Sequence, residues 1–425
     1  MERSNYTKIS TWNTSLKIRL IGEMLFNLLY WMYFPFITYY FVSALGNNIA
    51  GILMTIPPLI GIIGIIIGGN LAGRLGRRAA MLLGTSIRTI MFCIFAISDL
   101  YWLNYLAFIG IGLGGTIYGP ASDAMVADLV PQEARKQVFA TFMTANNIGA
   151  VIGPVLGSFF FFNYLSELLW ACTIVMLVYS IIVYVKIDET MPNYSRKRIN
   201  TNSISSGFKE EWNGYGEILS DKVFLLYILG GASAVIAIMQ LDLYLSVYII
   251  NYVPSQKLFV WNNLSVALDS KEIFAWMLVL NGVLFVFFVL PITKLLKSWN
   301  DRNVFILSAI LAGGGLFLVG FSTNIWMLFL LTIIFTFGEI VRAPVINNFV
   351  SDYAPEHARG KYMGASRLQF TIGRFLAPLT VFLAEWISPM GIFSIILFFA
   401  FMSVILYIKL YKSYERYITR VERNT

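Results

Sequence analysis

Apolar runs of about 20 residues recur along almost the whole chain, and each is long enough to cross the hydrocarbon core of a bilayer as a helix. The chain is 58% hydrophobic and 13% charged, and an average soluble domain has about twice that charged share. Helices satisfy their backbone hydrogen bonds internally in lipid, and the runs are too long for barrel strands. The sequence therefore predicts an all-α polytopic membrane protein.

Twelve of these runs are predicted to span the membrane, six on each side of a polar stretch in the middle of the chain. They begin near Leu16, Asn48, Arg78, Tyr101, Val138, Leu165, Asp221, Ile273, Val304, Ile325, Tyr362 and Pro389. This pattern predicts an N-terminal six-helix bundle over residues 1–187, a cytoplasmic linker over 188–220 and a C-terminal six-helix bundle over 221–425.

A charged turn is repeated in the two predicted bundles. Three of its residues recur 224 positions later, namely Asp128, Pro131 and Arg135 in the first bundle and Asp352, Pro355 and Arg359 in the second. At the same offset, Ala377 and Pro378 fall on Gly153 and Pro154. We interpret the chain as two homologous halves.

Lys and Arg are distributed unevenly over the predicted turns. Of the 31 such residues, 25 lie on the side of the two tails and the linker, whereas the other side has only Lys257 and Lys271. Positive residues concentrate on the cytoplasmic side, so both termini are expected in the cytoplasm, with the protein in a bacterial cell membrane. This bias accounts for most of the net charge of +8, and no nucleic-acid partner is expected.

Signals for a cofactor, a metal or an enzymatic site are weak. The single histidine, His357, is placed in a loop, and both Cys93 and Cys172 are placed in spans, so neither a metal site nor a disulfide is expected. The sequence has no glycine-rich nucleotide-binding loop, which disfavours an ATP-driven pump. A membrane-embedded acyltransferase or protease is the remote alternative, because it would need a nucleophile and a base inside the spans.

Two motifs resemble those of the major facilitator superfamily. Residues 69–78 (GNLAGRLGRR) are similar to its cytoplasmic signature, with Gly73 where the family usually has aspartate. The second motif resembles the signature of the drug/proton antiporter branch and consists of Gly149, Gly153, Pro154 and Gly157. The resemblance implies twelve helices in two six-helix pseudo-repeats and secondary transport by alternating access.

The resemblance also implies a conformational latch at the cytoplasmic ends of the first half. Arg77 and Asp128 are its expected ion pair, with Arg74 and Gly76 beside them, and the latch should be weakened by the missing aspartate at Gly73. The alternative is that these charges only set topology.

The glycines of the second motif predict a smooth helix seam. Glycines four apart lie on one helix face and permit close approach of another backbone, and Pro154 should bend the helix. We expect the two halves to rock on this seam, with ordinary small-residue packing as the alternative.

Acidic residues inside the predicted spans are the candidates for proton coupling and substrate binding. They are Glu23, Asp123, Asp242 and Glu339. Ionised groups in a membrane are costly and usually functional, and a low dielectric favours uptake of a proton. Asp242 and Glu339 lie in contexts similar to those of LmrP-type bacterial multidrug/proton antiporters, although Phe142 stands where that relative has a further acid. Pairing of Glu339 with Arg342 in a purely structural role is the alternative.

Three arginines in the second half allow a different substrate. Arg342, Arg367 and Arg374 could face an anion or a lipid headgroup, or could pair with the embedded acids. The leading hypothesis is a monomeric, proton-coupled exporter of lipophilic compounds, including cationic ones, that works without a cofactor and contacts protons, substrate and membrane lipids. A lipid or glycolipid flippase, or an exporter of an anionic metabolite, is the main rival.

Overall fold

The computed structural model describes residues 9–190, 220–261, 264–343, 345–346, 348–354, 362 and 365–424. The centre of the predicted linker, Pro355, His357 and Arg359 lie outside these residues. The first half of the chain contains η2 (Ile9–Thr11), α1 (Thr14–Leu53), α2 (Ile56–Arg74), α3 (Arg77–Ile97), α4 (Tyr101–Leu129), α5 (Gln132–Asn163) and α6 (Leu165–Lys186).

The second half is interrupted more often. Its first elements are α9 (Lys222–Ile238), η4 (Met239–Leu241), α10 (Tyr244–Tyr252), β1 (Gln256–Trp261), β2 (Leu264–Leu268), α11 (Ser270–Leu295) and η5 (Leu296–Ser298). They are followed by α12 (Asp301–Val319), α13 (Ile325–Arg342), α14 (Asn348–Tyr353), α16 (Leu368–Leu376), α17 (Leu379–Leu383) and α18 (Pro389–Asn424).

The predicted helical spans agree closely with these elements. Ten of the described helical segments are long and apolar enough to cross a membrane, and α4 and the apolar α16–α17 segment occupy the two remaining predicted positions. The second predicted span begins just after Gly46, where a positive φ of 81° interrupts α1. Short polar side chains fix several helix starts: Asp221 caps α9, Asn300 caps α12, and Asp269 forms a capping box with Glu272 at α11.

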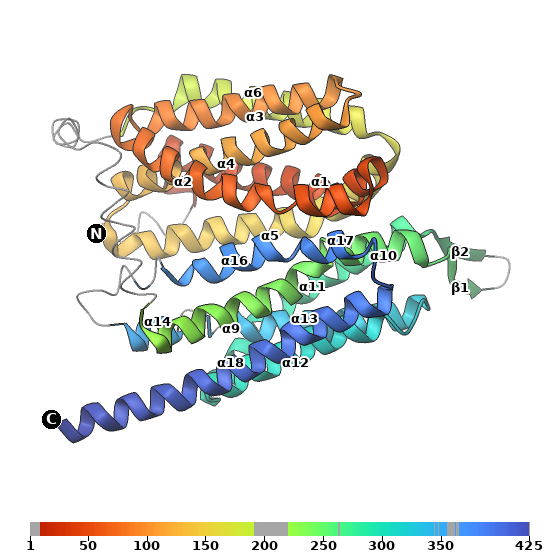
Figure 1. Ribbon diagram of the computed structural model, residues 1–425. Helices are drawn as coiled ribbons and strands as arrows, with labels where there is room; N and C mark the ends of the chain where they lie inside the picture. Colours follow the sequence, from red (N-terminus) through yellow and green to blue (C-terminus); the bar gives the residue numbers. More distant parts are fainter. Residues whose placement is uncertain are drawn as a thin grey trace. The chain divides into compact units, whose positions relative to one another are not determined.

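The chain forms two compact units. Unit 1 contains residues 1–37 and 56–206, and unit 2 contains residues 38–55 and 207–425. The end of α1 thus groups with unit 2, where Gly51 lies directly against the backbone of Phe382. In unit 1, α3 packs against both α4 and α6, as Figure 1 shows.

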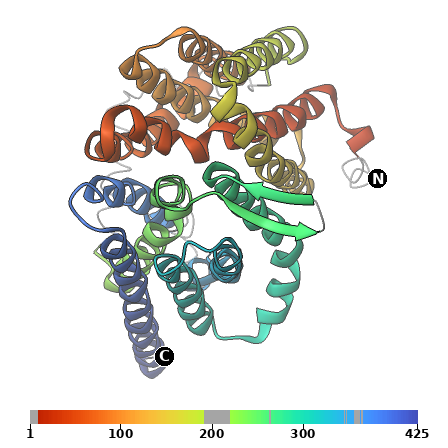
Figure 2. The same cartoon turned by 90° about the vertical axis from the view of Figure 1, so that its right-hand side faces the viewer.

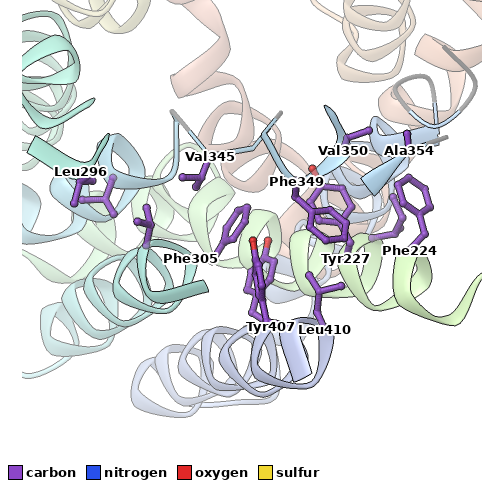
Figure 3. Packing of buried hydrophobic residues seen from close by; sticks show 14 of the residues in the cluster. Phe224, Tyr227, Leu296, Phe305, Val345, Phe349, Val350, Ala354, Tyr407 and Leu410 are labelled. Atoms are coloured by element: carbon purple, nitrogen blue, oxygen red, sulfur yellow. The ribbon is translucent and has the colours of Figure 1, made fainter. Parts of the chain in front are cut away.

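In unit 2, α9 packs between α16 and α18, and α12 packs against α13 and α18. The core of this unit is aromatic: Tyr227 stacks on Phe349 with ring centroids 4.9 Å apart, and Phe305 stacks on Tyr407 at 4.3 Å (Figure 3). Strands β1 and β2 form an antiparallel hairpin at one end of the unit (Figure 2). This packed core holds the helices that carry the candidate acids.

Candidate functional site

Asp242 lies at a break in the seventh predicted span. Helix α9 ends at Ile238, a single 3-10 turn follows, and α10 begins only at Tyr244. The backbone of Leu243 leaves the helical region (φ −109°, ψ −99°). Asp242 is 7% exposed, and its Oδ1 atom has no hydrogen-bond partner within the described part of the chain. A buried carboxyl group therefore stands where the regular backbone hydrogen bonds stop.

Gln240 stabilises this break. Its Nε2 atom donates to the carbonyl of Ile236 at 2.8 Å and to that of Ala377 at 3.2 Å. Its Oε1 atom accepts from the Thr380 hydroxyl at 2.7 Å. Ala377 and Thr380 belong to the second interrupted segment, α16–α17, so one buried amide side chain joins the two helix breaks.

Glu339 on α13 is held by a neutral neighbour. The Nδ2 atom of Asn281, on α11, donates to Glu339 Oε2 at 2.7 Å and to Thr336 Oγ1 at 3.0 Å. Thr336 is fully buried. Asp242 is close enough to Glu339 for the two carboxyl groups to interact electrostatically. The fold therefore brings the two leading acids together from different helices.

The arginines of unit 2 have different environments. Arg342 is buried and donates to Tyr407 Oη and to Gln369 Oε1, both at 2.9 Å. The ion pairs of the described residues do not include one between Arg342 and Glu339. Arg367 and Arg374 are exposed, and Arg374 attracts the charge of Asp242. A role of these arginines toward an anion stays a prediction.

The acids of unit 1 form a direct ion-pair cluster around Arg19. The guanidinium lies 3.0 Å from Glu23 and 2.6 Å from Asp123, and it covers the ring of Phe142 at 4.3 Å. Glu23 also accepts from Asn146 at 3.0 Å. Arg19 is only 4% exposed, because α1 begins before it and turns it toward α4 and α5.

Arg88 is a second buried arginine of unit 1 to which the sequence assigned no role. It is 6% exposed and covers the ring of Phe26 at 4.4 Å, and it interacts electrostatically with Glu23. The signal for Arg88 was an arginine inside an apolar run, which is as informative as an embedded acid.

The expected ion pair between Arg77 and Asp128 is present at 2.9 Å. Its action as a latch stays a prediction, as do the parts of Arg74 and Gly76 in it. The turn that lacks the family's aspartate has a different carboxylate. It is Glu189, after α6, which accepts from the backbone N–H of Arg77 at 2.8 Å. Gly76 has a φ of 104°, and a Cβ there would overlap the Glu189 carboxylate, which explains the glycine.

The seam glycines lie against α1 inside unit 1. A Cβ atom added to Gly149 would meet Asn27 and Leu28 on α1. A Cβ atom on Gly153 would meet Trp31, and one on Gly157 would meet Met32, further along the same helix. Pro154 lies inside α5. The close helix contact is therefore α5 on α1, and rocking of the halves on it stays a prediction.

Comparison with known proteins identifies the family. The model of the Major Facilitator Superfamily matches residues 20–257 and 257–423. The chain belongs to this superfamily. It is 32% identical over 417 residues to a Na(+), Li(+), K(+)/H(+) antiporter of Planococcus maritimus, covering 96% of this chain and 98% of that protein. It is 27% identical over 361 residues to the multidrug resistance protein MdtH of Cronobacter sakazakii, covering 83% of this chain and 82% of that protein.

Solved structures of the superfamily have the same fold. A POT family transporter in complex with 5-aminolevulinic acid has a TM-score of 0.76 at 15% identity, covering 96% of this chain and 98% of that one. The human organic anion transporter MFSD10 has a TM-score of 0.61 at 16% identity, covering 93% and 100%. The chain is thus a multi-pass membrane transporter with the superfamily fold of two six-helix repeats, and not an enzyme.

Proposed function

We propose that this protein is a proton-coupled antiporter of the cell membrane whose exchange site contains Asp242 and Glu339. The observation that carries the proposal is the buried Oδ1 atom of Asp242, which has no hydrogen-bond partner in the described part of the chain and lies near a second carboxyl group. A buried carboxylate needs a compensating positive charge. A proton and a cationic substrate can supply that charge in turn, and their competition couples the two fluxes.

The proton gradient provides enough energy for this exchange. One proton yields about 1.4 kcal/mol per pH unit, and each charge moved yields about 2.3 kcal/mol per 100 mV. Driven by an inward proton gradient across the cell membrane, protons would enter from outside and the substrate would leave. Alternating access would expose the site to each side in turn.

Two classes of substrate are favoured by different observations. The relative that shares 32% identity is named an antiporter of sodium, lithium and potassium for protons, which supports small inorganic cations. Relatives at lower identity are named multidrug resistance proteins, which supports export of lipophilic compounds. Flipping of lipids or export of an anion would use the exposed Arg367 and Arg374, and it is the rival proposal.

The test is proton movement in proteoliposomes that contain the purified full chain. With a higher cation concentration inside than outside, cations leaving the lumen should exchange for entering protons and acidify the lumen only when the protein is present, and Asp242→Asn and Glu339→Gln should each stop the response. Movement of fluorescent lipids without any cation-dependent proton movement would contradict the proposal and favour the flippase. Unchanged proton coupling in both variants would remove the two acids from the exchange site.

A further inference from the structure

We propose that the exchange site binds a small monovalent inorganic cation directly, and that Thr336 and Asn281 determine which cation it selects. The inference rests on the proposed function and deepens it, because it names the substrate class of that site. It assigns a role to two neutral side chains and to a helix break. The argument uses the donor atoms, the net charge and the burial of the site.

The acceptor atoms of this site are oxygens. Carboxylate oxygens come from Asp242 and Glu339 and a hydroxyl oxygen from Thr336, and the Asn281 amide presents its Nδ2 group to Glu339 and Thr336, so that its Oδ1 atom becomes a ligand only after the amide turns. Hard oxygen donors of this kind suit hard cations that bind without covalent character. Among the described residues, three or more His, Cys, Asp or Glu side chains do not gather at any place, so the donor set does not resemble that of a transition metal.

The break between α9 and α10 places irregular backbone beside Asp242, and the Leu243 carbonyl in it accepts from the Ser246 hydroxyl at 2.7 Å. An α-helix uses its carbonyls internally, whereas the turn at residues 239–243 interrupts that ladder beside Asp242. Interrupted helices within a membrane are tolerated where they are buried in protein or line a site, and unwound carbonyls of this kind coordinate ions in transporters.

The net charge of the site fits one positive charge. The two carboxylates carry two negative charges, and Arg374 attracts Asp242 from α16. The charged group that interacts with Glu339 is Asp242. Arg342 is not counted in the charge of the site, because its guanidinium donates to Tyr407 and Gln369. Two acids and one arginine leave a charge of minus one, which a single monovalent cation or a single proton neutralises.

Burial restricts the size of the ligand. Thr336 is 0% exposed and Asp242 is 7% exposed, and Asn281 bridges α11 and α13 directly through the 2.7 and 3.0 Å hydrogen bonds. A bulky organic cation would have to separate these helices, whereas a dehydrated ion needs only a rotation of the Asn281 amide. That rotation replaces the donated N–H groups with the Oδ1 acceptor.

The experiment adds NaCl, LiCl or KCl to proteoliposomes of the full chain and records proton movement against cation concentration. Thr336→Val removes the hydroxyl and keeps the side-chain shape, Thr336→Ser keeps the hydroxyl, and Asn281→Ala removes the amide. The matched control is Thr332→Val, because Thr332 is also buried on α13 but donates to the Leu328 carbonyl one turn away. Loss of a ligand to a charged group corresponds to about a 10- to 150-fold weaker affinity.

We expect Thr336→Val and Asn281→Ala to raise the half-saturating cation concentration at least tenfold and to change the order among the three ions. Thr332→Val, the control outside the site, should keep the wild-type half-saturating concentration and maximal rate, whereas Thr336→Ser, which keeps the hydroxyl, should keep the wild-type order among the three ions. As a readout that needs no transport, the cation should raise the melting temperature of the wild-type protein, and it should do so less for Thr336→Val.

The same half-saturating concentration and ion order in Thr336→Val, Asn281→Ala and wild type would overturn the inference. Exchange of protons for the lipophilic cation tetraphenylphosphonium but not for inorganic cations would also overturn it, while leaving the proposed antiport intact. Absence of proton movement with either class would reject the proposed function itself.

Discussion

The two units each contain a pair of acids within predicted spans, but the pairs have different partners. In unit 1, Arg19 is in direct contact with both Glu23 and Asp123. In unit 2, Glu339 accepts from the neutral Asn281, and Asp242 retains a buried oxygen without a hydrogen-bond partner among the described residues. A direct arginine partner compensates the charge of a carboxylate, whereas a buried acid without a direct ion pair is open to compensation by a proton or a bound cation.

The difference teaches that the presence of an acid in a membrane span is not enough to assign coupling. Removing the charge of a directly paired acid alters a structural ion-pair network. Removing the charge of an acid with neutral partners alters the binding of a mobile ion. Substitutions of the acids in unit 2 should therefore abolish transport, whereas substitutions in the Arg19 cluster of unit 1 should mainly change stability.

The largest effect is expected for Asp242→Asn and Glu339→Gln. Each changes the net charge of the exchange site from minus one to zero, so that it no longer attracts a cation, and proton-coupled exchange should fall by about 100-fold. Glu23→Gln in unit 1 should change the rate only severalfold. Initial rates in proteoliposomes, normalised to inserted protein, measure this. Equal losses of exchange rate for the substitutions in unit 1 and in unit 2 would contradict the proposed difference between the two pairs of acids.

Next in size is the loss of stability expected for Arg19→Met. The substitution leaves Glu23 without its counter-charge, and breaking a buried pair costs about 3–5 kcal/mol. Asp123 is 60% exposed, so solvent screening reduces the effect to about 2 kcal/mol. The melting temperature of the purified protein should fall by several degrees.

The control for Arg19→Met is the triple variant that also carries Glu23→Gln and Asp123→Asn. With no charge left uncompensated, its melting temperature should recover toward wild type. A triple variant that stays as unstable as Arg19→Met would show that Arg19 acts by packing on Phe142 rather than as a counter-charge.

A moderate effect is expected for Arg374→Gln. Because Arg374 attracts Asp242, it competes with a bound cation, and an exposed charge of this kind contributes about 1 kcal/mol. The half-saturating cation concentration should therefore fall about fivefold. It should rise in every variant as the pH falls, since protons occupy the same carboxylates. Arg367→Gln, on an exposed residue seven positions earlier, serves as the control and should be neutral.

The smallest effect is expected for Glu189→Gln, which touches neither acid pair. A carboxylate at a helix N-terminus contributes about 0.3–1 kcal/mol, and the amide keeps one acceptor for the Arg77 backbone N–H. Transport should change by about twofold or less, without any change in ion selectivity. A change in selectivity would mean that the cytoplasmic ion pair of Arg77 and Asp128 communicates with the exchange site.

Much of the fold follows from the sequence because apolar run length and capping residues are local signals. Helices α4, α6, α13 and α18 begin at the predicted residues Tyr101, Leu165, Ile325 and Pro389. The break at residues 239–243 was not predicted, since the apolar run continues through it and composition does not report where a hydrogen-bond ladder stops. The Asp128–Arg77 contact was predicted from family resemblance.

The candidate site could be predicted only in part. Asp242 and Glu339 are visible because charge in an apolar run is rare, but Asn281 and Thr336 are neutral and common in spans, so only the structure connects them with Glu339. Arg19 stands near the start of a span, so its position in the sequence did not indicate that it is buried. Its contact with Asp123 joins residues 104 positions apart, which no local pattern contains.

The most direct test compares two double variants in the same proteoliposome assay. One carries Asp242→Asn with Glu339→Gln, and the other carries Glu23→Gln with Asp123→Asn; both are scored for proton movement driven by a cation gradient. The account predicts no cation-dependent proton movement in the first variant and clear coupling in the second. Persistent coupling in the first variant, together with its loss in a well-folded second variant, would contradict the assignment of the exchange site to unit 2.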